Sequence, residues 1–191
     1  NFAANNNLLA REAGGEFLCF LNNDVFVEGD WLLPMLTVLR ERRDAGMVGN
    51  VQKLAHNGRY DHMGVVFAPQ GNPRHYGQGF FHRPFKGEVR EWNAVTAAYC
   101  ACRRDLFLEI GGFDEIFLNG CEDVDLCLRM SERGLRHYVV HDSVVVHVKG
   151  ASGGRKDHNE RNARILQERW GGKVLVNQAV RDQVPHACTY L

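Results

Sequence analysis

The clearest hydrophobic pattern along the chain is a run of five apolar, aromatic or thiol-bearing residues at positions 17–21. An uninterrupted run of this kind is typical of a strand buried on both faces, as in the middle of a parallel sheet. The run ends abruptly at Asn22, Asn23 and Asp24. Because ligands of open α/β sheets bind just beyond the carboxyl ends of the strands, we expect these three polar side chains to face a cleft.

The segments around this strand predict further helices and strands. Residues 1–13 form a weakly periodic helix that a glycine pair closes. A second helix is expected over residues 31–43, with Asp30 as its N-cap, followed by a short buried strand over residues 46–51. Between residues 52 and 91, glycine and proline separate short apolar pieces, which indicates hairpins or loops over the cleft and a place for substrate selectivity.

The second half of the chain continues the alternation of strands and helices that is typical of α/β proteins. The expected elements are, in order, a central strand along the cleft floor (92–102), a short helix (106–110), a helix (122–133), two strands (137–140 and 143–148) and an amphipathic helix (157–170). Between them lie loops, including a flexible glycine-rich loop at 150–154, and the last stretch from residue 173 shows no clear role. We therefore expect one α/β domain over residues 1–191.

Composition narrows the function without defining it. Lys plus Arg total 23 and Asp plus Glu total 23, so no global charge attracts nucleic acid or an anionic membrane. No apolar run approaches the roughly 20 residues of a membrane-spanning helix, and the six cysteines include no Cys-x-x-Cys pair. We expect a reduced, cytoplasmic protein without a transmembrane segment in this chain, which could lie peripherally at the inner face of the membrane.

Several side chains are candidates for chemistry, and each has a simpler explanation. Asp24 is a hard oxygen ligand for Mg²⁺ or Mn²⁺ on a diphosphate, but an Asn-Asp turn would also end a strand this way. Glu122, Asp123 and Asp125 crowd the first turn of a helix, where acids complement the helix dipole. His147, near the end of a strand, would ordinarily be a core histidine. The four histidines between residues 52 and 91 match no metal-site spacing and favour surface or local hydrogen-bonding roles.

The order in which these motifs follow one another indicates a function more specifically than any single motif does. Asn-Asn-Asp at 22–24, Ala-Val-Thr at 94–96, Gly-Gly-Phe-Asp-Glu at 111–115, Glu-Asp-Val-Asp-Leu-Cys-Leu-Arg at 122–129 and a strand ending in His147 follow one another. This series resembles the family-two glycosyltransferases of the GT-A fold over about residues 1–152. The resemblance is closest to bacterial members that build polysaccharides, including rhamnosyltransferase-like enzymes. It implies an α/β fold with a mostly parallel central sheet flanked by helices, with the family's first strands expected upstream of residue 1.

The resemblance also implies roles in donor binding. Asp24 would hold the divalent cation on the donor's diphosphate, and His147 matches the family's second metal ligand. Imidazole suits Mn²⁺ better than Mg²⁺, which favours Mn²⁺ slightly. Asn22 and Asn23 would lie near the nucleotide ribose and sugar, with Thr96 also on the donor side. Because the family's first motif acid is Asn22 here, Asp24 alone would supply this motif's metal ligand.

On the acceptor side, Asp123 matches the family's general base, which takes the proton of the attacking hydroxyl. Glu122 and Asp125 would orient the acceptor or brace the loop, and Gly111 and Gly112 would allow a tight turn below the sugar. One base and one Lewis acid suffice for direct displacement, with inversion at the anomeric carbon. The implied partners are a nucleotide-diphospho-sugar and a glycan or lipid-linked acceptor.

Two other classes of function remain open on the sequence alone. A non-catalytic glycan-binding domain could keep the fold without the activity. A metal-dependent nucleotidyltransferase would also use Asp24 with a cation, but it would need a basic, glycine-rich phosphate loop that does not appear. Within the single domain, we expect a metal and donor part (1–51), a variable hairpin segment (52–91), an acceptor and base part (92–154) and a C-terminal helix and tail (155–191).

Overall fold

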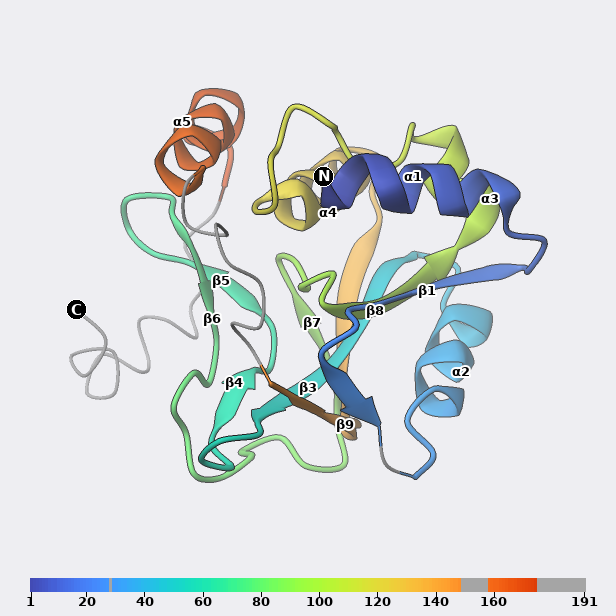
Figure 1. The fold of residues 1–191 in the computed structure, drawn as a ribbon, viewed down its shortest axis with the longest axis vertical. Helices are drawn as coiled ribbons and strands as arrows, with labels where there is room; N and C mark the ends of the chain where they lie inside the picture. Colours follow the sequence, from blue (N-terminus) through green and yellow to red (C-terminus); the bar gives the residue numbers. More distant parts are fainter. Residues whose placement is uncertain (28, 149–157, 175–191) are drawn as a thin grey trace.

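A computed structural model describes residues 1–27, 29–148 and 158–174 (Figure 1). The helices are α1 (Phe2–Glu12), α2 (Leu33–Glu41), α3 (Arg104–Glu109), α4 (Glu122–Glu132) and α5 (Asn159–Trp170). The strands are β1 (Phe17–Leu21), β2 (Val25–Val27), β3 (Ala45–Leu54), β4 (Tyr60–His62), β5 (Val65–Phe67), β6 (Pro73–His75), β7 (Val89–Trp92), β8 (Tyr99–Arg103) and β9 (Arg136–His147). The predicted loop at 150–154 and the tail from residue 175 lie outside the described residues, and no described helix is long and apolar enough to cross a membrane.

The main sheet is mixed, with the order β1-β8-β3-β9-β2, and β4 and β7 pair with β3 and β9 off this path. The two longest strands, β3 and β9, pair in parallel through the centre, and the other neighbours pair antiparallel. A separate two-stranded sheet, β5-β6, stands beside the main sheet and below α5 (Figure 1).

Helices cover both faces of the main sheet. On one face, α2 packs Met35 and Leu39 against Val48 and Tyr99, all fully buried. On the other face, the larger core includes residues of α1, α3, α4 and α5 (Figure 1). The expected helical and strand periodicities of α2, β3 and α4 are thus confirmed within a few residues of their predicted bounds.

The interpretation of β1 as a mid-sheet strand buried on both faces is wrong for this structure. β1 stands at the end of the sheet order, and among the described strands it pairs only with β8, antiparallel. Leu18 and Phe20 point into the core, while Cys19 is exposed and Leu21 is 48% exposed. An antiparallel sheet can pack one face on the core and leave the other in solvent, so the continuous apolar run does not imply burial on both faces.

Two predicted strand boundaries also change. The expected strand over 92–102 is two strands, β7 and β8, because residues 93–98 leave the sheet and residues 96–98 line a cavity. The two expected strands over 137–148 are one continuous strand, β9, whose pairing with β3 shifts register between Asn50 and Val51. A bulge lets one long strand change its local direction without ending.

His137 joins three elements beneath the sheet. The N–H of Met47 in β3 donates to His137 Nδ1 at 3.1 Å, so Nδ1 carries no proton. His137 Nε2 then donates to the carbonyl of Cys127 in α4 at 2.8 Å. Burial lowers the pKa of His137 from its ordinary 6.5 to about 4, and the Cys127 bond opposes this only in part. The folded protein therefore favours the neutral form of the His137 imidazole.

This arrangement predicts a pH-dependent stability. The folded protein resists protonating His137 and the unfolded chain does not, so the free energy of unfolding should fall as pH drops from about 6.5 to about 4. The loss attributable to this group should be about 3 kcal/mol. Chemical denaturation across this range should show a shallower pH dependence for His137→Gln than for the wild type. The exposed His56 supplies the control, and His56→Gln should keep the wild-type slope; equal slopes for all three would contradict the assignment.

Candidate active site

Most of the predicted site residues surround one cavity of about 550 Å³. Its walls come from the start of α1, the turn after β1, the β5-β6 hairpin, residues 96–98 and the loop that leads into α4. The lining residues are Asn1, Phe2, Asn5, Asn22, Asn23, Asp24, Val65, Pro73, His75, Thr96, Ala97, Ala98, Asn119, Gly120, Cys121, Glu122, Asp123 and Val124. Segments that are far apart in the sequence therefore converge where β1 ends.

Asp24 and His147 meet at one edge of this cavity. His147 is the last residue of β9, and β2 pairs Val25 with it directly after Asp24. The backbone N–H of Val148 donates to the carbonyl of Asp24 at 2.9 Å, which fixes the turn. The side chains lie 3.1 Å apart between Asp24 Oδ1 and His147 Nε2. His147 is 2% exposed, whereas the Asp24 side chain is 17% exposed and reaches the cavity.

The Asp24–His147 pair fits a divalent cation carried by a substrate. Among the described residues, no group of three or more His, Cys, Asp and Glu side chains could hold a metal ion. A cation that keeps several ligands from water and phosphate needs only one or two protein groups. The 3.1 Å separation is close to the ~3.0 Å between adjacent ligands of an octahedral ion with bonds of ~2.1 Å. A carboxylate and an imidazole together suit Mn²⁺.

Asp123 lies at the start of α4, on the cavity wall. Its Oδ2 accepts from the N–H of Ala97 at 2.9 Å, and its Oδ1 accepts from the N–H of Val124 at 2.8 Å. These two N–H donors hold both oxygens of the Asp123 carboxylate in a fixed orientation at the N-terminus of the helix. The segment that leaves the sheet after Trp92 thus returns to hold the predicted base in place.

The loop before α4 has an unusual backbone. Asn119 and Cys121 have positive φ values of 54° and 72°, and such residues gather at functional sites. Glu122 is buried, and its Oε2 accepts from the N–H of Gly120 at 2.5 Å, so it braces this loop. Burial and the neighbouring carboxylates, Asp123 first, raise the pKa of Cys121 to about 12. Cys121 therefore stays a neutral thiol at neutral pH.

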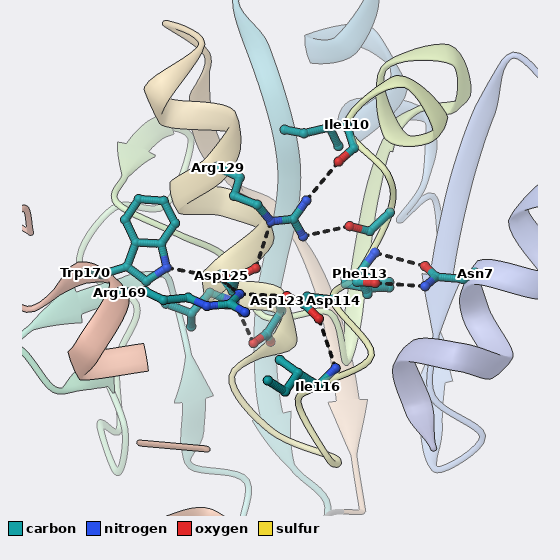
Figure 2. A network of polar contacts seen from close by, with 12 residues as sticks. Asn7, Ile110, Phe113, Asp114, Ile116, Asp123, Asp125, Arg129, Arg169 and Trp170 are labelled. Carbon is teal, nitrogen blue, oxygen red and sulfur yellow. Dashed lines mark hydrogen bonds and ion pairs between the residues drawn. The ribbon is translucent and has the colours of Figure 1, made fainter. Parts of the chain in front are cut away.

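Asp125 lies one step deeper, outside the cavity, and is the centre of a polar network (Figure 2). Its carboxylate is fully buried and accepts from Arg129 Nε at 2.8 Å, from Trp170 Nε1 at 3.0 Å and from Arg169 Nη1 at 3.2 Å. Arg169 also donates to Asp114 Oδ2 at 2.7 Å. Although burial opposes it, hydrogen bonds from Ile116 N–H and Arg169 lower the pKa of Asp114.

Because Asp125 is buried among these partners and is not among the lining residues, it braces the fold and does not contact the cavity.

The same network holds the Gly-Gly turn. Arg129 donates to the carbonyls of Ile110 at 3.0 Å and Gly112 at 2.7 Å (Figure 2). From α1, Asn7 donates to the Phe113 carbonyl at 2.8 Å and accepts from its N–H at 2.9 Å. Gly112 has φ +68°, and a Cβ there would overlap Asn7 Oδ1. The glycine is needed because Asn7 approaches the backbone so closely.

The structure brings together the predicted residues Asn22, Asn23, Asp24, Thr96, Glu122 and Asp123 around the cavity, with His147 bonded to Asp24. It leaves Asp125, Gly111 and Gly112 out of the cavity lining, so direct acceptor contact by these three is not what the geometry shows. The sequence analysis missed the supporting residues Asn7, Arg169 and Trp170. The sequence could have indicated Asn7, because it is spaced with Ala3 and Ala10 on the face of α1 that is buried in the core. No pattern in the sequence indicates the roles of Arg169 and Trp170, which become visible only in the folded structure.

Comparison with solved structures identifies the fold class. GalNAc-T7 with UDP, GalNAc and Mn²⁺ superimposes with a TM-score of 0.69 at 16% identity, covering 88% of this chain and 34% of that one. The mannosyltransferase PcManGT from Pyrobaculum calidifontis, in complex with GDP-Man and Mn²⁺, superimposes with a TM-score of 0.57 at 16% identity, covering 98% and 48%. The expected GT-A fold is therefore confirmed.

Sequence relatives identify the family. The chain is 36% identical over 158 residues to the O-antigen biosynthesis protein RfbC of Myxococcus xanthus, covering 80% of this chain and 12% of RfbC. It is 27% identical over 154 residues to rhamnosyltransferase WbbL of Escherichia coli (strain K12), covering 72% and 57%. The chain thus spans less than two thirds of these relatives' own length. Residues 4–172 match the profile of the family "Glycosyltransferase like family 2". The chain belongs to this family.

The Asp125 network generates a stability prediction. Asp125→Asn keeps the shape but removes the buried charge that two arginines share, so the free energy of unfolding should fall by about 3 kcal/mol, as when one partner of a buried ion pair is lost. Glu132→Gln is the matched control, because Glu132 also joins α4 to the end of α5 through Lys173, at 2.6 Å but in solvent. The control should change stability by less than about 1 kcal/mol. Urea denaturation measures the free energy of unfolding of both variants. Equal decreases in the two would contradict the assignment of Asp125 as the centre of the network.

Proposed function

We propose that this chain is a glycosyltransferase that moves a sugar from a nucleotide-diphospho-sugar to a hydroxyl of a glycan or lipid-linked acceptor, with a divalent cation and inversion at the anomeric carbon. The observation that carries the proposal is the shared cavity: Asp24, bonded to His147, and Asp123 line the same space. A carboxylate with a metal-ligand partner and a second carboxylate held by two N–H donors are the two groups that direct displacement requires.

In this proposal Asp123 is the general base. As the acceptor oxygen forms its bond to C1 of the donor sugar, the hydroxyl proton passes to a carboxylate oxygen of Asp123. The bond between C1 and the diphosphate oxygen breaks, and the nucleoside diphosphate leaves with the electron pair. Because the attack comes from the face opposite the leaving group, one displacement inverts the configuration. Glu122 supports this step by holding the loop beside Asp123.

Donor binding is assigned to other polar residues at the cavity. Asp24 and His147 would hold Mn²⁺ or Mg²⁺, and the bound cation would neutralise charge on the departing diphosphate. The amides of Asn22 and Asn23 and the hydroxyl of Thr96 supply hydrogen bonds for the ribose and sugar. The two structural neighbours support a metal-bound nucleotide-sugar, since their complexes contain Mn²⁺ with UDP and GalNAc or with GDP-Man.

The biological setting proposed is bacterial polysaccharide biosynthesis in the cell envelope. Support comes from the names of the relatives, an O-antigen biosynthesis protein and a rhamnosyltransferase. The five cysteines that the structure describes are all free thiols, which supports a reducing, cytoplasmic compartment.

The metal assignment predicts how nucleotide binding depends on two side chains. Calorimetric titration of a panel of nucleoside diphosphates should show binding that needs Mn²⁺, that Asp24→Ala abolishes and that His147→Ala weakens by a smaller factor. Asp142→Ala is a suitable control, because Asp142 pairs with Arg83 away from the cavity. If EDTA leaves sugar transfer untouched, Asp24 is a turn residue and the metal assignment is wrong.

The base assignment predicts a loss of turnover without a loss of donor affinity. With a panel of nucleotide-sugars and Mn²⁺, Asp123→Asn should lower turnover by ~10²–10⁴, the usual value of general base catalysis. Glu122→Gln is the neighbouring control, and it should act mainly on acceptor binding or stability. Nucleotide release and product formation measure both. Near-normal turnover in Asp123→Asn with loss in Glu122→Gln would assign the base to Glu122, and no release from any donor would favour a non-catalytic glycan-binding domain.

A further inference from the structure

The β5-β6 hairpin places a histidine on the cavity wall that the proposed mechanism does not use. His75 is the last residue of β6 and pairs with Val65 of β5. Both residues line the cavity together with Pro73, so the hairpin contributes one imidazole and two apolar side chains to the wall. Sugars offer the same mixture of hydroxyl groups and apolar C–H faces.

The chemistry of His75 follows from what its Nδ1 contacts. Nδ1 lies 3.2 Å from the backbone carbonyl of Asp61, and because a carbonyl only accepts, Nδ1 must carry the proton. The Asp61 carboxylate lies 3.8 Å from the same nitrogen and is 1% exposed. Gln78 Nε2 donates to Asp61 Oδ1 at 3.3 Å and steadies it. A fixed Nδ1–H leaves Nε2 as the nitrogen for an outside partner, and Nε2 bonds to no described residue.

The ring itself is held in one orientation. His62, fully buried in β4, packs edge-to-face against His75, with ring centroids 4.8 Å apart. A carboxylate, a carbonyl and an aromatic edge thus position a partly exposed imidazole whose side chain is 28% accessible. Such pre-organisation is typical of binding groups and costs little entropy when a ligand arrives.

The hairpin is tied to the base side of the cavity. The N–H of Val65 donates to the carbonyl of Ala94 at 3.0 Å, and three residues further on Ala97 donates to Asp123. The wall that carries His75 therefore continues directly into the segment that holds the proposed base.

We propose that His75 recognises the acceptor: its Nε2 hydrogen-bonds a hydroxyl of the acceptor sugar near the hydroxyl that attacks. Asp61 is the positioning residue that keeps this nitrogen turned to the acceptor. The assignment rests on the proposed function and names a specificity-determining group for it.

Three substitutions at His75 separate this role from a structural one. The amide of His75→Asn reproduces Nδ1 and its bond to Asp61 but cannot reach the acceptor. The longer amide of His75→Gln reproduces Nε2. His75→Ala removes both, and His56→Ala, at an exposed histidine outside the cavity, is the control. The probes are the nucleotide-sugar panel with Mn²⁺ and a panel of methyl glycosides of hexoses and 6-deoxyhexoses as acceptors.

We expect His75→Ala and His75→Asn to raise the acceptor KM roughly tenfold, the value of one hydrogen bond. His75→Gln should stay within about threefold of wild type, and His56→Ala should match it. Donor KM and the slow nucleotide release without acceptor should not change. Three outcomes would overturn the inference. The first is a near-normal acceptor KM in His75→Asn but not in His75→Gln. The others are a changed donor KM and an acceptor KM that is unchanged in all variants. If the wild type releases no nucleotide from any donor, the proposed function fails first, and the assignment of His75 fails with it.

Discussion

The buried carboxylate of Asp125 is the interaction on which the site depends. An isolated charge at this depth would be very costly, and the fold offsets the cost by pairing it with Arg129, Arg169 and the indole N–H of Trp170. These partners come from α4 itself and from α5. The pairing therefore makes the position of α4 depend on the presence of α5.

The Asp125 network is linked to several segments near the cavity. Arg129 carries it to the carbonyls of the Gly-Gly turn, and Asn7 fixes the other side of that turn from α1 (Figure 2). Asp123 lies two residues before Asp125, so the helix start that presents the proposed base is held from below. The last turn of α5 also approaches the β5-β6 turn, where a Cβ on Gly71 would lie 3.1 Å from Gln167 Oε1. One helix therefore packs against both the base wall and the hairpin wall.

The sequence predicted what local chemistry determines. The acids of α4, the polar end of β1 and His147 were recognisable because each sits at an element boundary, and the fold brings Asp24 and His147 to within 3.1 Å across 123 positions of sequence separation. The surroundings of β1 were not predictable, since the run at 17–21 reads alike whether a strand has one neighbour or two. Trp92 to Cys102 looked like a single strand because small apolar residues suit both a sheet and a cavity floor. Trp170 lies 45 positions from Asp125 and the Asp61 carbonyl lies 14 positions from His75, and no periodicity indicates such pairs.

The position of Asp125 in the first turn of α4 predicts that it acts on turnover through the placement of Asp123. A double-mutant cycle on turnover tests it most directly, with Asp125→Asn, Asp123→Asn and the double variant compared at a temperature where all three are folded. If the claim holds, Asp125→Asn should lower turnover about tenfold in the wild-type background and have little further effect when Asp123 is already Asn. Losses that multiply in full would show that Asp125 affects the reaction independently of Asp123, and would contradict the account.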